Sequence, residues 1–390
     1  CNGALGAAKS AGRNPRELGE KIAARLKADP LFASVTVAGP GFVNMTLTDE
    51  ALSARVNAGA PGWRVAAPET IILDYGGPNI AKPLHVGHLR SAIIGECLKR
   101  LFRASGHTVI GDIHMGDWGL PMGQLITEVK RERSELPYFD AGFTGPYPEQ
   151  SPVSLDDLER LYPQASAACK ADPARAAEAR QATAELQAGR PGYRALWAQF
   201  LAISRAAIER EYEELGVTFD WWKGEADADP LIAPMIEKLR QDGLTEIDEG
   251  AEIMRLARPG DKKDLPPLIL YKSDGAVMYG TTDLATILDR RETARPDRIL
   301  YVVDGRQRDH FEQVFRAADK AGIFPEDRLE HLWFGTMNGK DGKPFKTRAG
   351  GVLKLRDLIG QVQTAAFQRM IENDIVKGLT ESEAEDVKRK

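Results

Sequence analysis

The sequence predicts an α/β protein with a doubly wound parallel sheet, split by a mainly helical insertion and preceded by a small α+β domain. Short apolar runs at residues 70–74, 108–111 and 299–303 have the length and composition of buried parallel strands. Helical apolar spacing alternates with these runs over residues 68–128 and 266–336. A chain of 390 residues is long enough for roughly two or three domains.

The first 67 residues have a pattern of their own. Asn14 followed by Pro15 is typical of a helix start, with Asn as the N-cap and Pro at the first helical position. Residues 34–38 and 42–47 alternate as strands around a Gly-Pro-Gly turn. We therefore predict a separate α+β domain over residues 1–67, either a binding module or a packing module.

Residues 78–88 join the first predicted strand to an amphipathic helix at 89–102. This turn is rich in Gly and Pro and contains His85 and His88. Backbone N–H groups and the helix dipole favour phosphate at such a place, and two imidazoles can donate to its oxygens. Half of a metal site and satisfied core histidines are the plainer interpretations. No CxxC or HExxH motif accompanies the pair, which favours phosphate.

Residues 129–265 are mostly helical and polar, with amphipathic or capped helices predicted at 172–187, 193–215 and 231–241. We interpret this region as an insertion into the sheet domain. After the insertion the sequence again alternates between strands and helices. We predict strands at 268–271 and 299–303, a helix at 310–322 and a short strand at 332–334. Helices follow at 355–375 and from 380.

A cationic loop separates the last strand from these helices. Lys340, Lys343, Lys346 and Arg348 lie close together among glycines, against the single acid Asp341. Such a loop suits a leaving pyrophosphate, although a solvated charged turn would have the same composition.

Composition limits the remaining classes of function. The net charge of −5 does not suggest binding to nucleic acid by overall charge, so any RNA contact must come from local basic patches. No apolar run is long enough to span a membrane, and no secretory signal is seen. Cys1, Cys97 and Cys169 are few and far apart, which indicates a reducing, cytoplasmic setting. Both ends look like cuts within a longer protein.

The motif His85-Val-Gly-His88 resembles the HIGH motif of class I aminoacyl-tRNA synthetases, and the longer stretch 74–91 resembles arginyl-tRNA synthetases in particular. Residues 272–275, 279–283, 301–307 and 339–351 extend the resemblance over most of the chain. It implies a Rossmann-like catalytic fold with halves at 68–128 and 266–336, a connective insertion at 129–265, and a KMSKS-like loop with the start of a helical stem at 337–390. It also implies that the incomplete domain at 1–67 contacts the tRNA body.

The resemblance implies that L-arginine is activated with ATP to arginyl adenylate and transferred to tRNA(Arg), in the cytoplasm and without a membrane. ATP, with Mg²⁺, is a substrate, and no tightly bound metal is expected. Catalytic roles are implied for Lys82, His85, His88, Lys343 and Lys346. ATP contacts are implied for Pro78, His85, Gly87, His88 and Lys346.

For arginine the resemblance implies Asp74, Gly76, Asn79, His88, Tyr279, Asp283 and Gln307, with Glu225 as a second carboxylate candidate. Asp283 is the best guanidinium partner, and Tyr279, four residues earlier, would face the same way on a helix start. Asp283 could instead cap a helix at 284–291. At Gly76-Gly77, where many arginyl enzymes carry serines, backbone N–H groups are expected to substitute.

Two other functions stay open. One is another HIGH-bearing nucleotidyltransferase. Cysteinyl-type enzymes would need zinc-binding cysteines, which this sequence lacks, and small adenylyltransferases lack the insertion. The other is a synthetase-like or truncated protein that binds ATP or tRNA without charging activity. No anticodon-binding helical domain is recognisable after residue 375, so charging by this chain is an open question.

Overall fold

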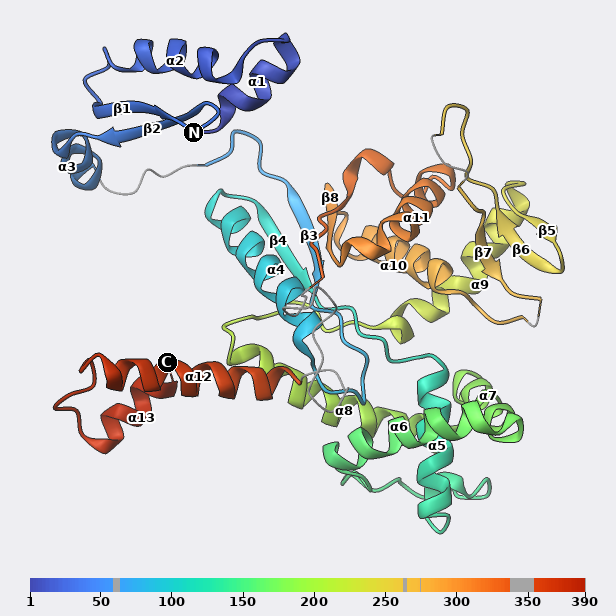
Figure 1. Ribbon diagram of the computed structural model, residues 1–390. Coiled ribbons are helices and arrows are strands. Elements are labelled where there is room, and N and C mark those ends of the chain that lie inside the picture. Colours follow the sequence, from blue (N-terminus) through green and yellow to red (C-terminus); the bar gives the residue numbers. More distant parts are fainter. Residues whose placement is uncertain (59–63, 262–264, 274, 337–353, 390) are drawn as a thin grey trace. The chain divides into compact units, whose positions relative to one another are not determined.

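The computed structural model describes residues 1–58, 64–261, 265–273, 275–336 and 354–389 (Figure 1). The chain divides into two compact units, Cys1–Arg64 and Val65–Lys390. The predicted helices and strands are largely present, and we describe each unit by itself.

The first unit is an α+β module. Its elements are α1 (Gly3–Ala11), α2 (Pro15–Leu26), β1 (Phe32–Ala38), β2 (Phe42–Leu47) and α3 (Asp49–Asn57). As predicted, Asn14 caps α2, and its side chain accepts from the backbone N–H groups of Arg16 and Glu17. The antiparallel pair β1–β2 packs on α2 through a small core of Ala23, Val35 and Val43.

The second unit is built on a four-stranded, fully parallel sheet with the order β4-β3-β8-β9. Its strands are β3 (Thr70–Tyr75), β4 (Thr108–Asp112), β8 (Arg298–Val302) and β9 (Leu329–His331). The helices on its two faces are α4 (Val86–Ala104), α10 (Tyr279–Ala294) and α11 (Arg308–Lys320), with short 3₁₀ turns at Gly305–Gln307 and Glu326–Arg328. The helix that follows β4, α5 (Leu120–Glu132), packs instead with the helices of the insertion. The doubly wound prediction is confirmed.

Alternation along β3 shows why both faces of this sheet are covered. Ile71 and Leu73 belong to a core shared with α4, whereas Ile72 belongs to a second core shared with α10 and α11. Because successive strand side chains point to opposite faces, a continuous apolar run buries both sides at once. Figure 1 shows α4 on one side of the sheet and α10 and α11 on the other.

The predicted helical insertion is present between β4 and the second half of the sheet. It contains a 3₁₀ turn at Pro137–Phe139 and the helices α6 (Leu155–Ala171), α7 (Pro173–Gln187), α8 (Pro191–Glu213) and α9 (Glu225–Gln241). A hairpin of β5 (Glu246–Asp248) and β6 (Ala251–Met254) follows. After residues 337–353, which lie outside the described part, come α12 (Leu355–Glu372) and α13 (Glu381–Arg389).

Two strand predictions require correction. The strand at 268–271 forms as β7 (Leu268–Tyr271), but it pairs antiparallel with β6 in a three-stranded sheet and takes no part in the parallel sheet. The last strand of the parallel sheet is β9, a few residues before the predicted 332–334. The apolar, half-buried sequence of β7 fixes its type but not its partners, and β9, with Leu329 as its one apolar residue, lacks the apolar run that the sequence signal requires.

Candidate active site

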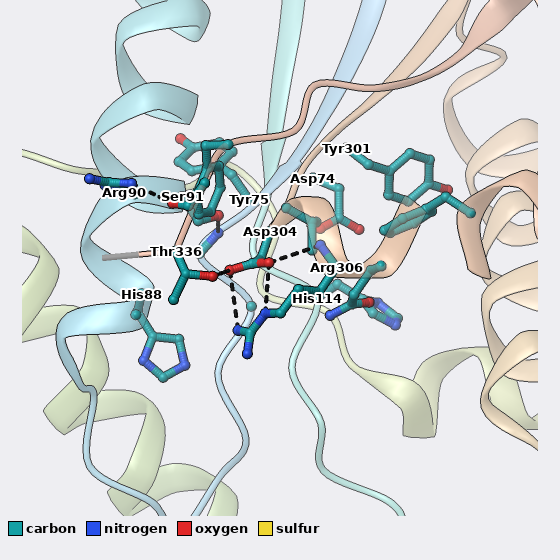
Figure 2. Close-up of a pocket in the computed structure, with 18 of the residues that line it drawn as sticks. Asp74, Tyr75, His88, Arg90, Ser91, His114, Tyr301, Asp304, Arg306 and Thr336 are labelled. Carbon is teal, nitrogen blue, oxygen red and sulfur yellow. Dashed lines mark hydrogen bonds and ion pairs between the residues drawn. The ribbon is translucent and has the colours of Figure 1, made fainter. Parts of the chain in front are cut away.

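A cleft of about 480 Å³ opens at the carboxyl ends of β3 and β8 (Figure 2). After β3 the chain passes through α4 to β4, which is one neighbour of β3 in the sheet. The other neighbour of β3 is β8, which follows only after the insertion. Doubly wound sheets bind ligands where the strand order reverses in this way. The cleft is lined by residues 74–77, 85–88, 90, 91, 114, 283, 301, 303, 304, 306, 307, 311 and 334–336.

The two motif histidines stand at the start of α4, and a backbone N–H group holds each ring in place. Nδ1 of His85 accepts from the N–H of Gly87 at 3.0 Å, and Nδ1 of His88 accepts from the N–H of His85 at 3.0 Å. A backbone N–H can only donate, so the proton of each neutral ring is on Nε2. The ring centroids are 3.9 Å apart. The turn therefore presents two Nε2–H donors side by side.

Electrostatics keep these rings neutral. Burial lowers the pKa of His88 to about 3, and the neighbouring His85 adds to the effect. Burial also lowers the pKa of His85, with a contribution from the Lys82 ammonium. At neutral pH both residues can thus donate hydrogen bonds to an anion without carrying charge.

Gly87 leaves the room that this arrangement needs. A Cβ at this position would lie 2.7 Å from Cε1 and 2.9 Å from Nδ1 of His85. The His85 ring therefore folds back over its own turn only because residue 87 has no side chain.

Ser91, one turn into α4, ties the helix to both central strands. Its hydroxyl donates to the carbonyl of Val302 at 2.6 Å and accepts from the N–H of Gly76 at 2.8 Å. The carbonyl of Gly76 accepts from the Tyr212 hydroxyl. The expectation that the Gly76 N–H serves the substrate is thus wrong, because Ser91 already occupies it.

A buried ion-pair group underlies the floor of the cleft. The Arg290 guanidinium is fully buried and lies 2.6 Å from Asp74 Oδ2 and 2.7 Å from Asp112 Oδ2. Burial raises the pKa of Asp74, and the positive charge of Arg290 opposes that effect. One oxygen of Asp74 is therefore committed to the protein's own guanidinium.

Asp283 lies on the second turn of α10 and lines the cleft. Its Oδ2 is 2.6 Å from Nε2 of His310, on the first turn of α11. The interpretation of Asp283 as a helix cap is wrong, because α10 begins at Tyr279 and Met278 is the N-cap. Glu225, the first residue of α9, is close enough for Asp283 to reinforce the rise that burial causes in its pKa.

The cleft brings together seven of the residues predicted for the site: Asp74, Gly76, His85, Gly87, His88, Asp283 and Gln307. Pro78, Asn79, Lys82, Glu225 and Tyr279 are not among its lining residues. Lys343 and Lys346 lie outside the described residues, as do Lys340 and Arg348.

The residues away from the cleft have other surroundings. The Lys82 ammonium is 4.6 Å from the ring centroid of Tyr162 on α6. Tyr279 is 74% exposed, so its shared direction with Asp283 stays a prediction from the helical spacing. Asn79 forms an isolated bridge with Gly116, and the buried Pro78 accepts from the Gly116 N–H.

Several lining residues were not predicted: Arg90, Ser91, His114, Tyr301, Asp304, Arg306 and Thr336. Asp304 accepts from the Arg306 side chain at 2.9 Å and from the Thr336 hydroxyl at 3.1 Å (Figure 2). Asp304 lies just after β8, and Asp74 lies one residue before the end of β3, so the position of Asp304 after a buried strand was a usable signal. Arg90 gave no such signal; its guanidinium donates to the carbonyl of Gly335.

The site is chemically two-sided. The α4 end offers neutral Nε2–H donors, which suit phosphate oxygens, and the α10 end offers the Asp283 carboxylate, which suits a cation. Within the described residues no group of three or more His, Cys, Asp or Glu side chains could hold a metal ion. No helix in that same part of the chain is long and apolar enough to cross a membrane.

Comparisons with known proteins identify the family of the chain. The family model "tRNA synthetases class I (R), catalytic domain" matches residues 51–390, and "Arginyl tRNA synthetase N terminal domain" matches residues 1–47. Over its whole length the chain is 52% identical to the arginine–tRNA ligases of Maricaulis maris and Hyphomonas neptunium, and it covers 67% of each. It thus spans about two thirds of these relatives.

Solved structures show the same fold. Arginyl-tRNA synthetase from Plasmodium falciparum matches with a TM-score of 0.67 and 22% identity, over 100% of this chain and 65% of that one. The enzyme from Thermus thermophilus matches with a TM-score of 0.63 and 18% identity, over 99% and 67%.

Proposed function

This chain belongs to the class I arginyl-tRNA synthetases, and from that premise we propose that it activates L-arginine with ATP and transfers it to tRNA(Arg). In the first step the arginine carboxylate attacks the α-phosphorus of ATP, which forms arginyl adenylate and releases pyrophosphate. In the second step the terminal ribose of the tRNA attacks the adenylate and releases AMP. One observation carries the proposal: a phosphate-donor pair and a guanidinium-acceptor carboxylate line one cleft.

The phosphate half of the proposal rests on His85 and His88. Negative charge builds up on the α-phosphate oxygens as the carboxylate attacks. Two Nε2–H groups fixed by backbone hydrogen bonds stabilise that charge without having to reorient. Because the rings are neutral, they do not hold the leaving pyrophosphate by charge, and we assign that role to the lysines at 343 and 346.

The arginine half rests on the wall opposite. Asp283 receives the guanidinium. Glu225 does not line the cleft, but its electrostatic interaction with Asp283 supports it as the second carboxylate candidate. The oxygen of Asp74 that Arg290 leaves unused, together with the Gln307 amide, is available for the α-ammonium group. For Asn79 and Tyr279 a contact with arginine stays a prediction from the family resemblance.

ATP enters as its magnesium complex, so the metal ion comes with the phosphates as part of the substrate. Lys82 adds positive charge near both imidazoles, which supports a role beside the phosphates even though its ammonium lies over Tyr162. Three cysteines in no disulfide support a cytoplasmic place of action.

The alternative is a synthetase-like protein that binds ATP or tRNA without charging. We test the two by ATP–pyrophosphate exchange with each of the standard amino acids, with and without tRNA(Arg). Exchange with arginine alone among the amino acids is expected. Binding of ATP and arginine without exchange, in the presence of tRNA, would favour the alternative.

A further inference from the structure

His310 contacts the carboxylate to which we assign the guanidinium, and it has no assigned role. We propose that His310 is a positioning residue for Asp283 and that its protonation state sets the affinity of the cleft for arginine. The inference rests on the proposed function, because it concerns the same guanidinium site.

The geometry defines what His310 does. Nε2 of His310 is 2.6 Å from Asp283 Oδ2, and the two side chains are only 30% and 28% exposed. A carboxylate can only accept, so the ring proton lies on Nε2 whether or not the ring is charged. Oδ1 of Asp283 accepts no hydrogen bond within the described residues and is left for the substrate. His310 thus directs one oxygen of Asp283 to the cleft.

The two ends of this pair come from separate helices. Asp283 is on α10, and His310 is on α11, which begins just after the cleft segment 303–307. The His310 ring is held edge-on by Phe311, with centroids 5.5 Å apart, and Phe311 itself lines the cleft. The hydrogen bond therefore fixes α10 and α11 relative to each other on the arginine side of the site.

The charge on His310 determines the net charge of the Asp283–His310 pair that an incoming guanidinium contacts. When the ring is neutral, Asp283 keeps a full negative charge; when the ring is protonated, the pair is neutral overall. Arginine and a proton on His310 consequently compete, so binding of one weakens binding of the other by the same factor. The hydrogen bond to Asp283 raises the pKa of His310 above its usual value, so the ring holds its proton more tightly than a free imidazole does.

Other titratable groups face the Asp283–His310 pair, and their effects on the pH dependence must be distinguished from the effect of His310. Glu225 and Tyr301 interact with Asp283, and His331 interacts with His310. Burial raises the pKa of Glu225 and of Tyr301, and it lowers the pKa of His331. A replacement at residue 310 leaves all three in place, so it isolates the contribution of His310.

The test is calorimetric titration of the full chain with L-arginine, at pH 6 and pH 8 and in two buffers with different ionisation enthalpies. The wild-type protein should lose at least about fivefold in affinity at pH 6 and release protons on binding. His310→Gln, whose amide nitrogen can occupy the Nε2 position, should bind arginine about as well as wild type at pH 8. It should lose both the proton release and the pH dependence.

Two further variants sharpen the outcome. His310→Ala should bind arginine several-fold more weakly than His310→Gln at pH 8, because the Asp283 carboxylate then lacks the hydrogen bond from residue 310 that positions it. His107→Gln, outside the cleft, should keep the wild-type proton release. Wild-type proton release and pH dependence in His310→Gln would overturn the inference and leave the proposed function intact. Failure of the wild-type protein to bind arginine at all would overturn the proposed function and the inference with it.

Discussion

The guanidinium of Arg290 lies 2.6 Å from the carboxylate of Asp74, at the point where β3 ends and the cleft begins. These residues are 216 positions apart in the sequence, and Arg290 is fully buried. The contact joins α10, which carries Asp283, to the strand that leads into the histidine turn. The arginine side and the phosphate side of the cleft are therefore held together by an internal arginine.

Replacement of Arg290 by Met should be strongly destabilising. It leaves the charges of Asp74 and Asp112 buried without a partner, which typically costs about 3–5 kcal/mol. Urea unfolding measures the change. Lys238→Ala, which removes an exposed ion pair with Asp242, should cost less than about 1 kcal/mol. Equal effects of the two replacements would contradict this role of Arg290.

Replacement of Asp283 by Asn should weaken arginine binding by at least about tenfold, because a hydrogen bond to a charged group contributes about 1.5–3 kcal/mol. Calorimetric titration with arginine measures the affinity. Asp289→Asn, on the same helix but paired with Lys223, is the matched control and should leave the affinity unchanged. Unchanged affinity in Asp283→Asn would move the guanidinium site toward Glu225.

The depressed pKa of His88 predicts a pH dependence of stability. Its folded value is about 3 and its unfolded value is about 6.5, so below pH 6.5 only the unfolded chain takes up the proton. Stability is therefore full above pH 6.5 and falls toward pH 3, by at most about 1.4 kcal/mol per pH unit for this group. His88→Gln should show a shallower loss of unfolding free energy between pH 7 and pH 5. An identical slope in the variant would contradict the buried, neutral state of His88.

Replacement of Gly87 by Ala should slow adenylate formation while the fold is retained. The added Cβ would lie 2.7 Å from the His85 ring, and this ring can swing away more easily than the backbone can shift. Nε2–H of His85 would then leave its place, and loss of one such donor typically costs about 100-fold or more. Pyrophosphate exchange gives the rate and circular dichroism the fold. Exchange at the wild-type rate would show that His85 is not needed in this position.

Local patterns carried most of the fold prediction. Residues 70–111 could be predicted from local sequence alone. A run of apolar residues, a Gly/Pro turn and an amphipathic helix are compatible with few structures other than strand, turn and helix. The cap at Asn14 is equally local, since its side chain contacts only the next residues. The partners of β7 were not predictable, because pairing with β6 depends on contacts that an apolar strand does not specify.

The site was predictable in part for the same reason. His85, His88 and Asp283 carry recognisable chemistry in sequence, and all three line the cleft. The contacts of Arg290 with Asp74 and of His310 with Asp283 each join two separate elements of the chain. No local sequence pattern therefore predicts them. Tyr279, the first residue of α10, is largely exposed and does not line the cleft, so its contact with arginine stays a prediction from the family resemblance.

The central claim is that the neutral imidazole of His88 stabilises the α-phosphate during arginine activation. The direct measurement compares arginine-dependent ATP–pyrophosphate exchange and arginine affinity in His88→Ala, with His107→Ala as a control outside the cleft. We expect exchange to fall by at least about 100-fold, while arginine affinity weakens by a much smaller factor. Near-normal exchange in His88→Ala would contradict the assignment of this residue to the phosphate.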